Sequence, residues 1–515
     1  MGIKKLMIIV SGLVLGCSSV LAREQPTAVG FVVSAQTQPS SPRSLTMKET
    51  ILLAQEQSIS SMVNRNIFAA AYWNHRSYKA DRLPSLNLSA GLVNVERSIM
   101  PLQDATTGAV NYRGVFTLRN DVSMFIRQKI SATGGTLSLA SSVQRFDQFN
   151  PDNLTWYSQP ITLSYMQPLF GYNAYKWSKR IEPHNFERAK LEYLENMENV
   201  SITAVGYFWG VAMARLNRDI AAGNYENSKR LYRIAEERYK IGSIGRDEVL
   251  QMELRVLNDS LAINSSQITY TSQRNRLASF IGLREDVDVE LDIDYELPGI
   301  ELDYDRVLAT ALENSSFELN QRIELLEAER AIAQARANRG IDVSFNARFG
   351  LSQSGESFSR AYSHLRSQQV AGFSVGIPIL DWGVGRGRVK MAESTAATIR
   401  YRQEQARIDF EQDILVRVME FNARGMQCEV SRRAAGIADE RFSLSVENFT
   451  RGTLSVTELN TAQTDRDNAH REYLANMGEY WTAYFALRRL SLFDWLSGTD
   501  IGAAFGKTEY DKLIE

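Results

Sequence analysis

Apolar residues recur every three or four positions in two long stretches of the chain, as on one face of a helix. They are Val200, Ala204, Phe208 and Val211 in the first stretch and Phe410, Ile414, Val418 and Phe421 in the second. No proline lies between Pro183 and Pro298, and none follows Pro378. Because an interior proline costs a helix roughly 3 kcal/mol, the pattern predicts very long helices. We expect them at 184–240 and 384–450, followed by returning helices at 246–281 and 456–491.

Four shorter segments alternate apolar and polar residues with a period of two, which is the pattern of strands with one apolar face. We expect strands at 85–95, 160–169, 342–352 and 370–379. A single such strand would suit a half-buried sheet on a soluble domain. Four in matching phase, each about ten residues long, favour strands that cross a bilayer at a tilt.

The two long stretches are copies of each other. A constant offset of 210 positions relates Pro168 to Pro378, Gly242 to Gly452 and Glu248 to Glu458, and an offset of 257 relates the segments that precede them. The chain therefore divides into a first repeat at 45–281, a linker at 282–301, a second repeat at 302–491 and a tail at 492–515. The first repeat carries 47 more residues than the second, and they fall within 97–160, at the far end of its strand pair.

Four strands cannot form a closed sheet by themselves. Lipid tolerates no open sheet edge, and single-chain barrels begin at about eight strands. Several chains must therefore contribute strands to one barrel, two chains giving eight strands and three giving 12. The sequence predicts a mainly α fold with a small β part that closes only as an assembly.

The N-terminus has the features of an export signal, with Lys4 and Lys5 before a short apolar core. Two cleavage sites compete within residues 1–22. Cleavage before Cys17 would leave that residue as a lipid-bearing first residue, and cleavage after Ala22 would discard it. A Ser/Gln/Thr-rich stretch follows and predicts a flexible linker over 23–44.

Composition removes several classes of function. A net charge of -2 gives no electrostatic reason to expect nucleic acid or anionic lipid as the main partner. The uncharged run at 200–214 is too short for a spanning helix, which needs roughly 20 residues. The four histidines lie far apart without acidic or cysteine neighbours at ligand spacing, so we expect no metal, no cofactor and no catalytic centre.

The junctions between strands and helices resemble those of the TolC-like outer-membrane factor (outer membrane efflux protein) family. The segments that carry the resemblance are Gln167-Pro168-Leu169-Phe170 and Ile377-Pro378-Ile379-Leu380-Asp381-Trp382-Gly383 at the junctions, and Tyr239-x-x-Gly242-x-Ile244-x-x-x-Glu248 and Phe449-x-x-Gly452-x-Leu454-x-x-x-Glu458 at two turns. The resemblance covers about 45–492. Its motifs are short, but they recur at a constant offset around matching strands.

The resemblance implies a passive export duct rather than an enzyme. In such a duct, three chains form a 12-stranded barrel in the bacterial outer membrane, continued by an α-helical, coiled-coil tunnel through the periplasm. The expected partners are two further copies of the chain, outer-membrane lipid, a periplasmic adaptor protein and an inner-membrane pump of a tripartite efflux or type I secretion system. The helix length agrees, since 67 residues from Val384 to Thr450 extend about 100 Å.

The resemblance also implies a site at the turns farthest from the strands. These tips are expected to dock the adaptor through Ile241, Gly242, Ser243, Ile244, Gly452, Thr453, Leu454 and Ser455. Glu248 and Glu458 follow the tips and would line a closed periplasmic aperture, where three chains bring six carboxylates together. The other interpretation is that each glutamate stabilises a helix N-terminus. Position 454 is Leu where relatives can have a gating Arg, and Arg246 or Arg451 would have to replace it.

Two other classes of protein share some of these features. A trimeric coiled-coil surface protein also combines a signal with long helices, but it would lack the matched strands. A secreted enzyme would need a polar cluster that the sequence does not contain. Neither the exported substrate nor the class of pump follows from the sequence.

Overall fold

The computed structural model describes residues 43–103, 106, 108–149, 152–283 and 289–504. The export signal, Cys17 and the predicted linker up to residue 42 lie outside the described residues. From residue 44 onward, the described residues belong to one compact unit. Its helices are α2 (Met47–Gln57), α3 (Ile59–Ala80), α4 (Ala174–Lys240), α5 (Arg246–Phe280), α6 (Tyr304–Asn314), α7 (Phe317–Arg339), α8 (Phe358–Ala361), α9 (Val384–Arg451), α10 (Val456–Ser491) and α11 (Ile501–Ala504).

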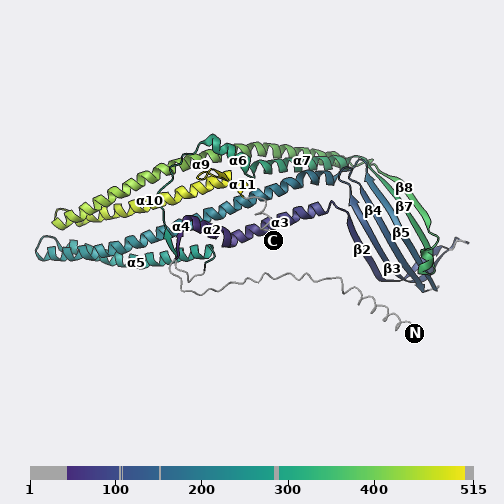
Figure 1. Cartoon of the computed structure of the whole chain (residues 1–515), viewed down its shortest axis with the longest axis horizontal. Helices are drawn as coiled ribbons and strands as arrows, with labels where there is room; N and C mark the ends of the chain where they lie inside the picture. Colours follow the sequence, from purple (N-terminus) through teal and green to yellow (C-terminus); the bar gives the residue numbers. More distant parts are fainter. Residues whose placement is uncertain (1–42, 104–105, 107, 150–151, 284–288, 505–515) are drawn as a thin grey trace, which may run out of the picture. The chain divides into compact units, whose positions relative to one another are not determined.

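The internal duplication is confirmed element by element. The pair α2 and α3 corresponds to α6 and α7, and the pair α4 and α5 corresponds to α9 and α10, at the two offsets found in the sequence. The two long helices have 67 and 68 residues. Figure 1 shows each of them folded back on its returning helix at the end remote from the sheet, with α10 between α4 and α9.

The helical periodicity corresponds to a shared core. Phe208 and Val211 on α4 are buried together with Ile414 and Phe421 on α9, in one cluster that also includes Tyr480 on α10. The faces that the spacing marked as apolar thus contribute to one core across the two repeats, in which α10 contacts both long helices. Burial of this seam, rather than helix propensity, holds helices of this length together.

The first long helix begins earlier than the sequence suggested. Its start was expected at residue 184, after Pro183, but α4 begins at Ala174 and contains Pro183. A proline leaves the carbonyl four residues earlier, here that of Lys179, without its helical partner. Both Pro183 and Lys179 are exposed, so water can bind that carbonyl. The position that corresponds to Pro183 in α9 is Glu393.

The strands form a six-stranded antiparallel sheet, so the expectation of four strands per chain was wrong. The sheet order is β2-β3-β4-β5-β7-β8, which is also the order along the chain. The two unexpected strands, β3 and β4, lie within 97–160, the range that holds the extra residues of the first repeat. The strands of the sheet are β2 (Ser85–Gln103), β3 (Val110–Lys129), β4 (Thr136–Phe149), β5 (Asp152–Pro168), β7 (Asp342–Gly355) and β8 (Arg366–Gly376).

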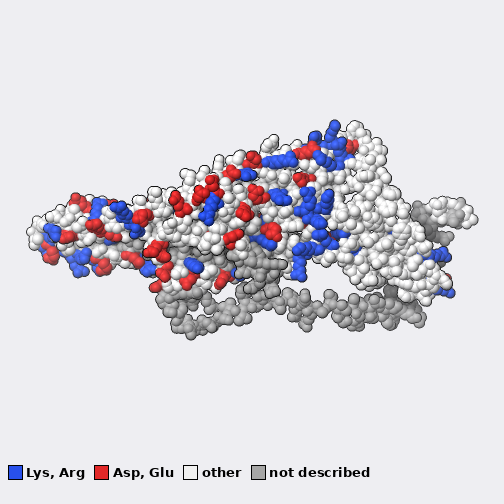
Figure 2. Space-filling view, turned by 45° about the horizontal axis from the view of Figure 1, so that its top comes forward, with Lys and Arg blue, Asp and Glu red and all other residues white. Residues whose placement is uncertain are grey.

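One face of this sheet is apolar and open. The register places Leu88 opposite Met124, and further along the sheet Leu163 opposite Phe349. Leu88 is 72% exposed and Phe373 is 67% exposed, although both are large apolar side chains. A continuous apolar surface of this kind marks a contact with lipid or with another protein. On the side seen in Figure 2, the surface of the sheet shows few charged residues, and the helical part beside it carries charges of both signs.

The segments outside the repeats also have structure. The predicted linker at 282–301 contains β6 (Val289–Asp292), which pairs with β1 (Arg43–Thr46) and buries Val289. The tail contains β9 (Phe493–Asp494) and β10 (Thr499–Asp500). In the described part of the chain, no helix has the length and apolar character needed to cross a membrane.

Candidate functional site: the hairpin tips and the contacts behind them

The two predicted turns are tight reversals with the same backbone. Gly242 and Gly452 have positive φ angles of 74° and 84°. At the first tip the N–H of Ser243 donates to the carbonyl of Arg238 over 2.8 Å, and at the second the N–H of Thr453 donates to that of Asn448 over 3.0 Å. Together with the glycine N–H bonds at each turn, this is the Schellman arrangement, which requires a left-handed residue at the glycine.

The tips are packed together by their own small core. Ile244 is buried in a cluster with Phe449, Leu459 and other residues of both hairpins, and Leu454 is partly buried against it. Of the residues predicted to dock an adaptor, these two therefore contribute packing. The residues that remain at the surface are Ile241, Gly242, Ser243, Gly452, Thr453 and Ser455.

The two glutamates differ in their surroundings, although they hold equivalent positions. Glu458 forms a capping box, since its carboxylate accepts from the N–H of Ser455 over 3.0 Å and the Ser455 hydroxyl accepts from the Glu458 N–H over 3.3 Å. These hydrogen bonds hold the pKa of Glu458 below its ordinary value, so it is ionised. In the first repeat Gly245 occupies the place of Ser455, and it has no side chain with which to cap α5. Glu248 is partly exposed and forms no ion pair with a described residue.

The arginines around the tips also differ. Arg451 forms an ion pair with Glu447 on its own helix, and Arg246 forms none with the described residues. Arg238 crosses between the hairpins, because its guanidinium donates to the carbonyl of Phe449 over 3.2 Å and lies over the Phe449 ring. A cation at the carbonyl end of a helix is favourable, so this contact stabilises the end of α9.

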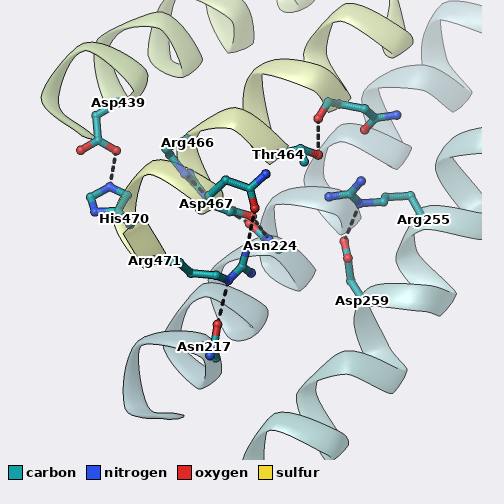
Figure 3. Close-up of polar contacts among 12 residues, drawn as sticks. Asn217, Asn224, Arg255, Asp259, Asp439, Thr464, Arg466, Asp467, His470 and Arg471 are labelled. Atoms are coloured by element: carbon teal, nitrogen blue, oxygen red, sulfur yellow. Dashed lines mark hydrogen bonds and ion pairs between the residues drawn. The ribbon is translucent and has the colours of Figure 1, made fainter. Parts of the chain in front are cut away.

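Behind the tips, a buried polar cluster joins the two hairpins. The amide of Asn224 on α4 donates to Asp467 on α10 over 2.6 Å, and Arg466 donates to Asn224 over 3.0 Å and to Asp467 over 2.6 Å (Figure 3). Asn224 and Asp467 are both buried. Buried polar groups are costly unless they are paired, so this cluster favours one alignment of α4 against α10.

Further polar contacts lie along the same helices. Arg255 donates to Asp259 over 3.2 Å within α5, and the hydroxyl of Ser228 on α4 also donates to that carboxylate. Arg471 on α10 donates to Asn217 on α4 over 2.8 Å, as Figure 3 shows. His470 and Asp439 are joined over 2.9 Å between α10 and α9. These contacts connect all four long helices near the tips.

The glycine-rich turn at the start of α9 is a junction and not a phosphate loop. The carboxylate of Asp381 accepts from the N–H of Gly383 over 2.9 Å and from that of Gly385 over 2.7 Å, where a phosphate would have to bind. These bonds lower the pKa of Asp381. Among the described residues, no group of three or more His, Cys, Asp and Glu has an arrangement that holds a metal ion.

Sequence reasoning did not find the polar cluster of Asn224, Arg466 and Asp467. Asn224 and Asp467 are 243 positions apart in the chain. At the offset of 210 that relates the repeats, neither of these two residues corresponds to a polar residue that would have indicated the pair. The only signal available was a polar residue on the apolar side of α4. Such residues are common on exposed helices, so this signal is weak.

Residues 307–491 match the family model described as outer membrane efflux protein. The match lies within the second repeat. No curated protein sequence matches the chain.

Solved outer-membrane channels share the fold over nearly the whole chain. The outer membrane protein VceC of Vibrio cholerae is 13% identical, with a TM-score of 0.61 over 86% of this chain and 95% of its own. The CmeC channel of Campylobacter jejuni is 14% identical, with a TM-score of 0.65 over 91% of this chain and 90% of its own. The channel OprN is 16% identical, with a TM-score of 0.61 over 91% and 97%. The resemblance to the TolC-like factors is thereby confirmed.

Proposed function

We propose that this protein is the outer-membrane channel of a tripartite efflux or type I secretion system and that it conducts cargo without catalysis. The observation that carries the proposal is the sheet, whose apolar face is exposed and whose two edge strands, β2 and β8, each have an outer edge that no described strand pairs with. A soluble monomer would leave both features in water. In a membrane, lipid covers the face and neighbouring chains cover the edges.

The two edge strands run in opposite directions, which allows a barrel to close between copies of the chain. Strand β2 leaves the helical end, since it follows α3, and β8 returns to it, since it precedes α9. The β8 edge of one chain can thus pair antiparallel with the β2 edge of the next. An even number of strands per chain is required for this, and six fulfils it.

Three chains are the favoured number, as in the family that the chain resembles. They would close an 18-stranded barrel rather than the 12-stranded barrel expected from the sequence. Because barrel diameter grows with strand number, the extra hairpin should widen the outer-membrane opening. Barrels of 16–18 strands are wide enough to leave an aqueous channel.

The helical part would continue the duct through the periplasm. Helices of 67 and 68 residues are about 100 Å long at 1.5 Å per residue. Their tips lie farthest from the sheet, where a periplasmic adaptor and an inner-membrane pump would meet the channel. The exposed tip residues, with Ile241 79% exposed, offer the surface for the adaptor.

The competing function is a trimeric coiled-coil surface protein. It would share the long helices, but it has no use for a six-stranded sheet with an apolar outer face. The test is to reconstitute the detergent-purified protein into planar bilayers and to record single-channel currents. We expect stepwise conductance from the trimer fraction. Trimers that insert but never conduct would contradict the proposal and favour the surface protein.

A further inference from the structure

A set of basic side chains surrounds a hollow where the sheet meets the helices of the second repeat. The hollow has a volume of about 620 Å³ and is lined by Arg336 and Arg339 at the end of α7 and by Arg386 and Lys390 at the start of α9. We name these four residues the second quartet. Its one acidic neighbour in the lining is Glu393, which bonds Arg336 over 2.9 Å and Lys390 over 3.1 Å.

The second quartet carries more positive charge than the nearby carboxylates neutralise. Arg339 and Arg386 form no ion pair with a described residue, and the side chains of Arg336 and Lys390 are 64% and 74% exposed. The nearby carboxylate of Asp381 is already bound to two backbone N–H groups. The hollow is therefore a site of net positive charge that is open to an anion.

The same four positions are basic in the first repeat. At the offsets of 257 and 210, the members of the second quartet correspond to Lys79, Arg82, Lys176 and Arg180. We name these the first quartet, and all four are exposed. Glu393 has no acidic counterpart, because Pro183 holds its position. Both copies of the duplicated unit thus carry basic residues at all four positions, although the residue type differs at three of them.

The position of the two quartets beside the sheet indicates which kind of anion would bind to them. Arg339 lies three residues before β7, and Lys79 and Arg82 lie just before β2, so the charges follow the edge of the apolar sheet. Figure 2 shows Lys and Arg side chains gathered at the boundary between the helices and the face of the sheet seen there, which shows few charges. The turn between β8 and α9 adds exposed apolar residues, with Ile379 93% and Trp382 88% exposed. Basic residues beside exposed aromatic and aliphatic groups are typical of the headgroup level of a membrane.

We propose that each quartet binds the phosphate of an anionic phospholipid headgroup in the periplasmic leaflet of the outer membrane. This inference rests on the proposed function, because it requires the sheet to lie in a bilayer. Arginine forks suit phosphate oxygens, and the adjacent Trp382 and Ile379 reach the acyl region. A trimer would carry six such sites, one at each junction between strands and helices. They would fix the depth of the channel in the membrane.

The test compares lipids on the intact trimer. The detergent-solubilised protein is incubated with phosphatidylglycerol, with phosphatidylcholine or with inorganic phosphate, and native mass spectrometry counts the molecules retained. We expect about tenfold preference for phosphatidylglycerol over phosphatidylcholine, and no displacement by millimolar inorganic phosphate. Displacement by inorganic phosphate would show a general anion site and would overturn the assignment to lipid.

Three variants localise the effect. One variant neutralises only the second quartet (R336Q, R339Q, R386Q and K390Q), and another neutralises both quartets. A matched control variant removes four exposed arginines from the same two helices, farther from the sheet (R322Q, R400Q, R402Q and R433Q). We expect the variant without the second quartet to retain about half as much phosphatidylglycerol as the wild type. The variant without both quartets should lose the preference for phosphatidylglycerol over phosphatidylcholine, and the control should keep this preference. Equal loss in the control would overturn the proposal.

Trimer mass and channel conductance are measured on the same samples. Conducting trimers of the wild-type protein that hold both lipids equally would overturn the lipid sites and leave the channel function intact. A wild-type protein that neither trimerises nor conducts would overturn the channel function itself. If neutralising both quartets changes ion selectivity and leaves lipid retention unchanged, the quartets face the lumen and the proposal is wrong.

Discussion

At the scale of single residues, equivalent positions in the two repeats have acquired different roles. Glu458 is fixed by Ser455 in a capping box, and Glu248 follows a glycine that cannot cap. The helix-stabilising interpretation therefore applies to Glu458 and less to Glu248. A role at the aperture stays a prediction for both residues, since it depends on the arrangement of three chains.

The change Glu248→Gln with Glu458→Gln tests that role. If six carboxylates surround one axis, neutralising them should weaken the preference for cations and relieve block by periplasmic divalent cations. Planar-bilayer recordings with and without a divalent cation measure both effects. The single changes serve as controls for stability, because glutamine at position 458 can still accept from the Ser455 N–H and each change removes only a charge near a helix N-terminus. Unchanged selectivity and block in the double variant would limit both glutamates to a structural role.

A second residue-scale prediction concerns Glu198, which is buried on α4. Burial raises the pKa of Glu198 to about 7, outweighing Arg488, whose Nε lies 3.3 Å from the carboxylate without forming a hydrogen bond. The folded protein therefore holds this proton more tightly than the unfolded chain, where the pKa is about 4.3. Stability should fall as the pH rises from about 4.5 to about 7, by roughly 3 kcal/mol, and stay level above.

The measurement is the thermal midpoint of the purified protein between pH 4 and pH 8, compared with Glu198→Gln. The wild type should lose stability relative to the variant over this interval. Glu195 also has a raised pKa through burial and is unchanged in the variant, so the difference between the two curves isolates Glu198. Parallel curves would show that the pKa of Glu198 is the same in the folded protein as in the unfolded chain.

At the scale of elements, the hairpins are aligned by the cluster of Asn224, Arg466 and Asp467. Asp467→Ala would leave the Asn224 amide and the Arg466 guanidinium without their buried acceptor, which costs about 3 kcal/mol. The matched control is Asp465→Ala, because Asp465 pairs with Arg441 at the exposed surface and should cost much less. Chemical denaturation compares the two. Equal losses would indicate that the buried cluster does not align the helices.

The second element-scale prediction concerns the extra hairpin of β3 and β4. Replacing residues 99–155 by the shorter connector of the second repeat, residues 356–365, would join β2 directly to β5. The apolar faces remain in phase, since Leu86 and Tyr165 correspond to Val343 and Val375, which pair in the second repeat. We expect trimers that still assemble, with a barrel of smaller diameter in electron-microscopy images. Failure to assemble would show that the hairpin is required for closure.

At the scale of the whole molecule, the open edges of the sheet predict the assembly. Light scattering of the detergent-extracted protein should give the mass of a trimer, and images that resolve strands should count 18. The two edges differ in length, with 19 residues in β2 and 11 in β8, so the outer part of β2 should extend beyond the partner strand. A stable monomer, or a barrel of 12 strands, would contradict the closure argument.

The sequence by itself determined the periodic elements and their duplication. Helical spacing at Val200 and Phe208, alternation at Leu86 and Leu88, and the constant offsets between repeats are local properties, and the structure confirms each of them. Glycine at positions 242 and 452 indicated the chain reversals for the same reason. Its lack of a Cβ permits the left-handed backbone that each turn requires.

Other features were decided only by the tertiary structure. Strands β3 and β4 escaped detection because their alternation is broken, for example by Phe125 on the polar face, and pairing with neighbouring strands compensates for a weak local pattern. A helix was expected to begin after Pro183, but the packing of α4 before and after this residue keeps the helix continuous. The contacts of Asp467 with Asn224 and the basic hollow around Arg386 join residues far apart in the chain, which local patterns cannot bring together.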